Sequence, residues 1–326
     1  MATATLLLPA GDRFAGVRLP DPLARALGRA DRMAAGEAGE RAQLLRHFEL
    51  LPRGWPVAAL TRQVDAGDAA PSQWLRADPA WVRPEINGAR LFACGEGLQL
   101  AQQDVDALLP ALRPLFGDAG FPIDAPAPSR WYLRLPPGAR LPGFVEPVDA
   151  LGADLFDSLV GTEGAADAES RRWRSLLSEA QVVLHNHPWN ARRAAAGKPP
   201  VNSLWFWGGG RLPDHVSSRH ACVQSDDTLL RALAAAAELP LAPRASRFDA
   251  PAGDGLFDLR DLRDPAVLFD QWLAPAVDAL RRGGLERLDL DLADGGGFAS
   301  THSQRWRLWR RPLRELAAAQ PEQPSA

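Results

Sequence analysis

Two glycine-rich segments, each directly after an apolar run, are the first places where this sequence could bind an anion. In WGGGR, Gly208, Gly209 and Gly210 precede Arg211, and in DLADGGGF, Asp294 precedes three further glycines. Glycines can expose backbone N–H groups to an anion, and an arginine can bind one through two parallel hydrogen bonds. Neither segment matches a dinucleotide-binding or P-loop pattern, so the alternative is that both are tight turns. If both strand ends share one sheet edge, we expect a cleft there.

Histidines and nucleophiles offer less chemistry. His185 and His187 are two residues apart, and on a helix they point in nearly opposite directions, which makes a poor metal chelate. His215 and His220 are five residues apart without a firm helix between them. The sequence has no G-x-S-x-G motif, and its two cysteines are most simply explained as small buried residues.

The remaining candidate ligands lie close together in the sequence. If a ligand site exists, we expect it to contain His187, Asn190, Arg193, Asn202, Gly208, Gly209, Gly210, Arg211 and Asp294. The arginines would supply paired donors to an anionic group. In the alternative reading, the asparagine amides bind nearby backbone groups and Arg193 pairs with Glu179 or another acid.

Hydrophobic periodicity predicts alternating strands and helices, which indicates an α/β fold with a layered sheet and flanking helices. Strands are predicted at 3–8, 57–65, 74–95 (two strands about a turn), 129–135, 200–210 and 285–293. Helices are predicted at 21–51 (divided near Gly36 and Gly39, with Asp21 as N-cap), 103–120, 170–187, 191–197, 227–239, 265–284 and 303–319.

The expected organisation is a main sheet built from both ends of the chain. Residues 1–70 are predicted to form an N-terminal strand-helix segment of that sheet, 71–200 an inserted α+β subdomain, and 201–320 the C-terminal part of the sheet, followed by a disordered tail at 321–326. A stretch rich in Pro, Gly and Asp at 136–169 is a candidate boundary.

Composition restricts the partners. The net charge of −3 and pI of about 6.1 give no support for a nucleic-acid or membrane-surface partner. No apolar run approaches the roughly 20 residues that cross a bilayer, and the N-terminus lacks a basic region before its three leucines. We therefore expect a cytoplasmic protein.

One segment resembles a known family. Residues 184–213, LHNHPWNARRAAAGKPPVNSLWFWGGGRLP, resemble a segment of the archaeal-type cofactor-independent phosphoglycerate mutases, which belong to the alkaline phosphatase superfamily. The matching residues are His187, Pro188, Asn190, Arg193, Gly197, Pro200, Asn202, Gly208 and Gly210. With SEAQ before it and NSLWFWGGG after, the segment is closer still to a bacterial family of RpfE-type regulatory proteins. The resemblance extends to RADPAWVRPEINGARLFACG and SRWYLRLP.

The resemblance implies a degenerate alkaline-phosphatase-like and phosphoglycerate-mutase-like fold, with this segment in or beside a substrate-covering insert. In that family a serine nucleophile and two metal ions held by Asp and His perform the chemistry. Here Asp294 matches one motif, but Phe298 stands at its histidine position. Pro9 interrupts the expected Asp-Gly after the first strand, and Thr61 is the only hydroxyl residue within 40–70.

Three functions remain open. We favour a non-catalytic cytoplasmic regulatory protein, a pseudoenzyme without cofactor that binds a small anionic metabolite or a protein partner. The second is a phosphoglycerate mutase-like isomerase, or a phosphatase, that uses Mn or Zn through unrecognised ligands. The third is a protein-interaction module that uses the basic helix predicted at 303–319, with Trp306 and Trp309.

Overall fold

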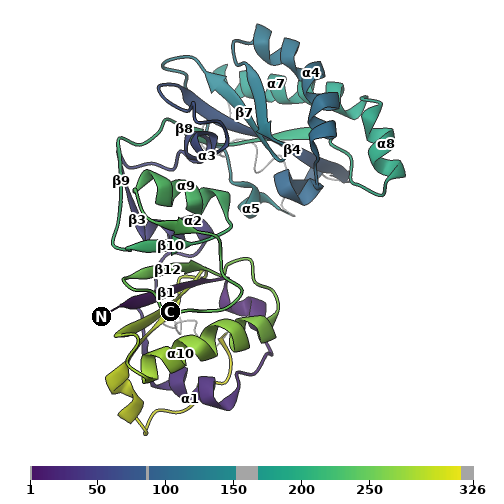
Figure 1. Cartoon of the computed structure of the whole chain (residues 1–326). Coiled ribbons are helices and arrows are strands. Elements are labelled where there is room, and N and C mark those ends of the chain that lie inside the picture. Colours follow the sequence, from purple (N-terminus) through teal and green to yellow (C-terminus); the bar gives the residue numbers. More distant parts are fainter. Residues whose placement is uncertain (1, 86–87, 152–167, 317–326) are drawn as a thin grey trace, which may run out of the picture. The chain divides into compact units, whose positions relative to one another are not determined.

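The computed structural model describes residues 2–85, 88–151 and 168–316. The chain forms two compact units (Figure 1), one made of Met1–Pro52 with Asp214–Ala326 and the other of Arg53–Pro213. The second unit is therefore inserted between the two parts of the first. No helix of the described residues is long and apolar enough to cross a membrane.

The first unit contains a seven-stranded sheet to which both parts of its chain contribute. The order is β11 (Leu241–Ala242), β10 (Cys222–Gln224), β12 (Gly255–Asp258), β1 (Thr3–Leu8), β13 (Arg287–Leu292), β14 (Gly297–Thr301) and β2 (Asp31–Arg32). Neighbours from β11 to β13 are parallel, whereas β14 is antiparallel to both β13 and β2. A separate pair joins β3 (Phe48–Leu51) to β9 (His215–Ser218).

Helices cover one face of this sheet with an apolar core. Alternate residues of β1 and β13, including Leu6, Leu8 and Leu290, pack with residues of α1 (Asp21–Arg29) and α10 (Ala274–Arg281). The π-helical segment η3 (Val267–Leu273) leads into α10, and the remaining helices are η1 (Gly11–Phe14), α2 (Glu40–Leu45), α9 (Thr228–Ala236) and η4 (His302–Trp306). Because side chains alternate along a strand, Leu7 and its partners in register point to the opposite face.

The second unit contains an antiparallel sheet organised around one long strand, β4 (Gln73–Glu85). Its other strands are β5 (Gly88–Cys94), β6 (Ile123–Ala127), β7 (Arg130–Leu135) and β8 (Ser203–Gly210). β4 pairs with β5, β7 and β8, and β6 pairs with β7.

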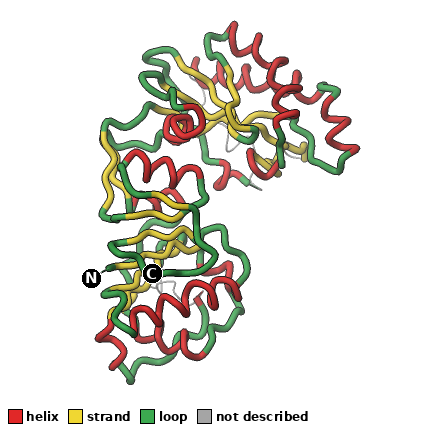
Figure 2. The backbone as a smooth tube through the Cα atoms, in the orientation of Figure 1, coloured by secondary structure: helices red, strands yellow, loops and turns green. Residues whose placement is uncertain are grey.

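Helices lie on both faces of this second sheet (Figure 2). α4 (Gln102–Asp118) and α7 (Ala168–His185) pack on Leu75, Leu204 and Phe206 in a core that also contains Trp173, which stacks on Phe121 at 4.8 Å. On the opposite face, residues of α3 (Val57–Ala66) pack with Trp74 and Tyr132. The other helices are η2 (Gly95–Leu98), α5 (Pro147–Ala150) and α8 (Trp189–Ala195).

Most predicted elements are confirmed, but the strand predicted at 57–65 is wrong. This segment is the helix α3, which ends at Gly67 in the left-handed conformation with φ +72°. The short apolar run fits either period, and the helix wins because its alanines Ala58 and Ala59 allow close approach to the sheet. Asp21 is likewise the first residue of α1 and not its N-cap.

The basic helix predicted at 303–319 is also wrong. Only η4 is helical there, and from Arg307 to Glu315 the chain is irregular, while residues 317–319 lie outside the described part. Leu313 donates its backbone N–H to the carbonyl of Ala24, and Leu316 is buried in the first unit's core. These contacts with α1, together with Pro312, replace a helical backbone pattern.

The boundaries of the two units differ from the predicted domain bounds. The units divide at Pro52 and Pro213, not near 70 and 200 or within 136–169. Strand β8, which the sequence assigns to the main sheet, pairs with β4 in the second unit. The predicted tail at 321–326 lies outside the described residues.

Candidate functional site

The asparagines of the family-like segment bind backbone, not an open site. The amide of Asn190 donates to the carbonyls of Leu184 and Val201 and accepts from the Val201 N–H at 2.8 Å. Asn202 binds both backbone groups of Val82 in β4, accepting from its N–H at 2.9 Å and donating to its carbonyl at 2.7 Å. Each side chain replaces a backbone partner where the chain passes from α8 into β8.

Arg193 is committed in the same way. It is buried, pairs with Asp104 of α4 at 2.9 Å, and donates to the carbonyls of Pro199 and Leu98. The expectation of an acidic partner is confirmed, although the partner is Asp104 and not Glu179. His187 caps the following turn, since its Nδ1 accepts from the N–H of Trp189.

Gly208, Gly209 and Gly210 lie inside β8, where Gly208 and Gly210 allow the close approach of α3 and its N-terminal loop. A β-carbon on Gly209 would instead meet the side chain of Leu141. The strand predicted at 200–210 is confirmed, and a turn within the three glycines is wrong, because the strand continues through Gly210. A β-carbon on Gly208 would lie 2.8 Å from Cβ of Val57, and one on Gly210 would lie 2.6 Å from Cβ of Pro56. Both contacts would be too close, so only glycine fits.

The two glycine-rich segments belong to different sheets. Gly208–Gly210 belong to the sheet of the second unit, whereas Asp294 lies in the turn between β13 and β14 of the first. Asp294 stabilises that turn by accepting the N–H groups of Gly11 and Gly296. Arg211 is exposed just after β8.

Titratable groups gather instead where the parallel strands of the first unit end. Asp258, the last residue of β12, and Asp291 in β13 are both in register with Leu7 of β1. The two aspartates therefore flank β1 and point to the same face, with Cα atoms two strand spacings, roughly 10 Å, apart. The carboxyl ends of parallel strands are the usual place for a site in an open α/β sheet.

Asp291 is the centre of a hydrogen-bonded network that includes Arg46, His47 and His220. Arg46 donates to both of its oxygens, at 2.6 and 3.0 Å, and His47 Nε2 lies 2.7 Å from Oδ2. The other ring nitrogen of His47, Nδ1, lies 3.0 Å from Nε2 of His220. Burial acts to raise the pKa of Asp291, but the hydrogen bonds from His47 and Arg46 outweigh it and keep this pKa below its ordinary value.

The imidazole pair has an unusual electrostatic state. Both histidines are buried, and burial together with the neighbouring His47 lowers the pKa of His220 to about 3. His220 is therefore neutral at physiological pH, and its hydrogen bond to His47 couples their tautomers. An aspartate that orients a histidine is typical of acid-base sites, but the third group here is an imidazole and not a hydroxyl or thiol nucleophile.

Asp258 is held by a second guanidinium. Arg260 donates to both carboxylate oxygens at 2.8 Å, and Ser225 donates to Oδ2 at 2.7 Å. Arg260 also reaches Asp227, the N-cap of α9. Burial acts to raise the pKa of Asp258, and the bonds from Arg260 bring this pKa below its ordinary value.

The carboxylates of Asp258 and Asp291 do not fit the two-metal centre that the sequence resemblance implies. Each oxygen of Asp258 and Asp291 already accepts at least one charge-assisted or hydroxyl hydrogen bond, and a Mn or Zn ion there would lie beside a guanidinium. Among residues 2–85, 88–151 and 168–316, no three His, Cys, Asp or Glu side chains are grouped so that they could hold a metal.

The second unit has a polar cluster of its own beneath α3. Arg76 and Asp78 of β4 form a buried bidentate pair at 2.8 Å, and Trp207 donates to Asp78 at 2.7 Å. Tyr132 donates to Asp65, which also accepts two bonds from Arg130. This cluster ties α3 to the sheet, and its groups satisfy one another.

Sequence reasoning missed the cluster at the strand ends because its members are far apart in the chain. His47 and His220 are separated by 173 residues, and Arg46 and Asp291 by 245. The available signal was the alternation of Asp289 and Asp291 with leucines in a predicted strand, since a carboxylate on the buried face of a strand requires a partner.

Comparison with known proteins locates the chain's relatives. No family model matches it. A stretch of 73 residues is 41% identical to the probable 2,3-bisphosphoglycerate-independent phosphoglycerate mutase of Geobacter sulfurreducens and covers 22% of this chain and 17% of that protein. The corresponding mutase of Methanosarcina barkeri is 36% identical over 73 residues, with the same coverage.

Two solved structures are similar at low identity. The cofactor-independent phosphoglycerate mutase from Thermoplasma acidophilum aligns over 99% of this chain and 96% of its own, with 15% identity and a TM-score of 0.43. A Pyrococcus horikoshii protein aligns over 91% and 87%, with 11% identity and the same score. The expected resemblance to cofactor-independent phosphoglycerate mutases is thus confirmed for part of the chain by sequence identity, while the α/β architecture rests on the strands and helices described above.

Proposed function

We propose that this protein is a non-catalytic regulatory or binding relative of the cofactor-independent phosphoglycerate mutases. One observation carries the proposal, namely that Arg46 and Arg260 occupy the two strand-end carboxylates, Asp291 and Asp258. Membership of the RpfE-type bacterial regulatory family and a cytoplasmic location are parts of the same proposal.

Charge supports this proposal. A buried carboxylate bound by a guanidinium is already neutralised, and a divalent cation would have to displace that guanidinium or lie against it. Arg260 is itself buried, so displacing it would leave an uncompensated charge in the protein interior. The arrangement therefore favours a stable folded site over metal-dependent phosphoryl transfer.

The family-like segment supports it as well. Its distinctive residues, among them Asn190, Arg193 and Asn202, bind backbone groups or Asp104 within the second unit. Their pattern is explained by folding alone, so the likeness to the mutases does not require a shared reaction. We infer that the ligand is a small anionic metabolite or a protein partner, and neither a nucleic acid nor a membrane.

Turnover of phosphoglycerate with added metal tests the proposal. Purified protein is incubated with 3-phosphoglycerate and Mn²⁺ or Zn²⁺, and formation of 2-phosphoglycerate is followed by NMR. The Geobacter sulfurreducens mutase serves as the positive control in the same buffer. We expect no metal-dependent conversion and no hydrolysis to free phosphate.

A second experiment measures metal binding independently of turnover. Mn²⁺ binding is measured by calorimetry for the natural protein and for the double variant Arg46→Met, Arg260→Met. We expect no Mn²⁺ binding by the natural protein. Metal-dependent conversion by the natural protein would establish the mutase or phosphatase alternative and end this proposal.

A second candidate function, a protein-interaction module, is favoured by the exposed tryptophans of the C-terminal segment. Trp306 and Trp309 are 67% and 76% exposed, and Leu308 between them is 70% exposed. Arginines at 305, 307, 310 and 311 surround them. Such a surface fits an acidic protein partner, because Arg and Trp are the residues that most often dominate protein interfaces.

Point substitutions test this candidate better than truncation. Removing residues 303–326 would also remove Leu316 from the core and the bonds of Gln304 and Arg307 to Asp31. The variant Trp306→Ala, Trp309→Ala leaves these contacts in place. Loss of binding to an acidic protein captured by the natural chain, with unchanged thermal stability, supports the module, and undiminished binding contradicts it.

A further inference from the structure

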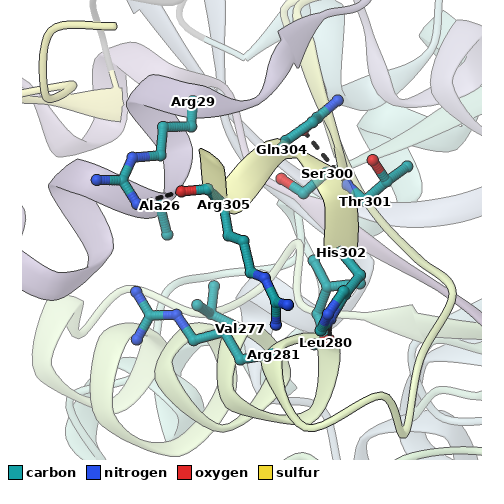
Figure 3. Close-up of a pocket in the computed structure, with 10 residues that line it drawn as sticks. All are labelled: Ala26, Arg29, Val277, Leu280, Arg281, Ser300, Thr301, His302, Gln304 and Arg305. Atoms are coloured by element: carbon teal, nitrogen blue, oxygen red, sulfur yellow. Dashed lines mark hydrogen bonds between the residues drawn. The ribbon is translucent and has the colours of Figure 1, made fainter. Parts of the chain in front are cut away.

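A second polar site lies in the first unit at the N-terminal ends of β1 and β13, opposite to the strand ends that carry Asp258 and Asp291. Thr301 at the end of β14 is in register with Arg287, which is itself in register with Thr3. A pocket lies beside this edge between α1, α10, β14 and η4, and Figure 3 shows its lining. The lining residues are Ala26, Arg29, Val277, Leu280, Arg281, Ser300, Thr301, His302, Gln304 and Arg305.

The pocket is strongly cationic although the protein is acidic overall. Arg29, Arg281 and Arg305 come from three different elements and surround the same opening (Figure 3), and none of the lining residues is an aspartate or glutamate. The floor includes the apolar side chains of Ala26, Val277 and Leu280. Three like charges brought together repel one another, so the arrangement favours an anion between them.

The three guanidiniums retain unused donors. Arg29 donates to the carbonyl of Arg305 at 3.0 Å, and Arg305 lies over the ring of Trp306 at 4.9 Å. The carboxylate nearest to Arg281 is that of Asp278 at 3.6 Å, and both of those side chains are about half exposed. A guanidinium has five N–H donors, so these contacts leave several for a ligand.

Arginines at helix ends often serve the helix itself, but here other groups do that. The carbonyl of Leu280 at the end of α10 accepts from His302 Nδ1 at 3.1 Å and from the N–H of Gly283. The carbonyl of Arg29 at the end of α1 accepts from Arg307. The cations of the pocket are therefore not consumed by the helix carbonyls.

We propose that this pocket binds the phosphate group of a small phosphate monoester or free inorganic phosphate. Its volume of about 40 Å³ can hold one compact oxyanion. A phosphate carries close to two negative charges at neutral pH and three acceptor oxygens, which match three guanidiniums better than a carboxylate does. Ser300 and Thr301 at the end of β14 also line the pocket.

The site is separate from the carboxylates of the proposed function. Asp258 and Asp291 lie at the carboxyl ends of the strands, whereas this pocket lies where the strands begin. A phosphate site here is compatible with a catalytic or a non-catalytic protein. A result that contradicts the phosphate site therefore does not contradict the proposed function, and the reverse also holds.

Calorimetric titration of the full chain tests the pocket, with inorganic phosphate and glycerol 3-phosphate as probes and acetate at equal ionic strength as a reference. The variants are Arg281→Gln and Arg305→Gln. Arg282→Gln is the matched control, because Arg282 is exposed beside Arg281 but does not line the pocket. Thermal unfolding without ligand verifies that each variant is folded.

We expect phosphate binding that weakens about tenfold in each pocket variant and is unchanged in Arg282→Gln, since each lost arginine removes a charge-assisted hydrogen bond. Equal affinity for both probes would identify the phosphate group alone as the ligand, and tighter binding of the ester would identify the monoester. Absence of binding by the natural chain would overturn the proposal. Equal weakening in all three variants would also overturn it, because it would indicate general charge attraction.

Discussion

His47 and His220 form a buried imidazole pair whose facing nitrogens, Nδ1 and Nε2, lie 3.0 Å apart. The pair joins the segment before β3 to the segment after β9, two strands that themselves pair. Asp291 holds the far side of His47 at 2.7 Å. One aspartate thereby fixes the tautomer of one histidine and, through it, the hydrogen bond of the next.

The free energy of unfolding should decrease as the pH is lowered, because of His220. Its pKa is about 3 in the folded protein and 6.5 ordinarily, so between these values the unfolded chain binds a proton that the folded chain does not. The free energy of unfolding therefore decreases as pH falls from 6.5, by about 2 kcal/mol at pH 5 for this group. His220→Asn should flatten this dependence when urea unfolding is measured between pH 7.5 and 5.

The control is His215→Asn on the same strand pair. His215 is exposed, and the pH dependence of His215→Asn is the reference with which that of His220→Asn is compared. An unchanged slope in His220→Asn would show that His220 is protonated in the folded state at pH 5. Asp291 adds its own loss only in more acidic solution, below its ordinary pKa of 3.8.

Removing one partner of the ion pair between Asp258 and Arg260 should lower the free energy of unfolding more than removing both. Both residues are buried, so Arg260→Met leaves a carboxylate without its counter-ion and should cost about 3 kcal/mol in the free energy of unfolding. Adding Asp258→Asn removes the orphaned charge and should restore part of that loss. The measurement is a double-mutant cycle by urea unfolding.

Arg263→Met supplies the reference for this cycle. Arg263 is exposed and donates only to the carbonyls of Arg260 and Leu262, so its loss should cost no more than about 0.5 kcal/mol. If Arg260→Met were equally mild, the two strand-end carboxylates would be less dependent on guanidiniums than the proposed function requires.

Local pattern predicted much of the fold and little of the site. Strands such as β1 and β13 and helices such as α4 carry a clear period and were predicted from it. The segment that became α3 is too short and too rich in small apolar residues for its period to decide. Its helical form depends on Trp74 and Tyr132, which lie on strands that the segment itself does not specify.

The candidate ligand residues are distinctive in the sequence for a structural reason. Asn190, Asn202 and Arg193 stand out because their side chains replace backbone partners, and a residue with that role is as distinctive in sequence as a ligand. The predicted alternative role for the asparagines is the one that the structure has. His47 gave no local signal, and the alternation of Asp291 with leucines did not identify its partner, since their proximity depends on how the segment before β3 packs on β13.

Asn202→Asp should destabilise the second unit. The substitution keeps the acceptor for the Val82 N–H but replaces the donor to the Val82 carbonyl with a second oxygen, which repels it. We expect a loss of about 2 kcal/mol by urea unfolding. Asn186→Asp is the matched control, because Asn186 is exposed and bonds only the Val182 carbonyl. Similar losses in the two variants would show that the bond between Asn202 and β4 is dispensable.

Gly208→Ala should lower the free energy of unfolding by more than the cost of placing alanine in a left-handed backbone conformation. Gly208 has φ +64°, and Gly197 has nearly the same value, φ +69°, but no atom lies within 4 Å of a β-carbon built there. Gly197→Ala should therefore lose only the cost of the left-handed backbone, about 1 to 2 kcal/mol. Gly208→Ala adds a contact of 2.8 Å with Cβ of Val57, and crowding of this kind costs about 1 to 3 kcal/mol more.

The difference between these two alanine variants isolates the packing of β8 on α3, because the backbone cost is common to both. Urea unfolding of each variant gives that difference directly. A larger loss in Gly208→Ala supports the conclusion that WGGGR is a strand held close to a helix. Equal losses would mean that α3 moves away from β8 at little cost, and the glycines would then need a reason other than close approach.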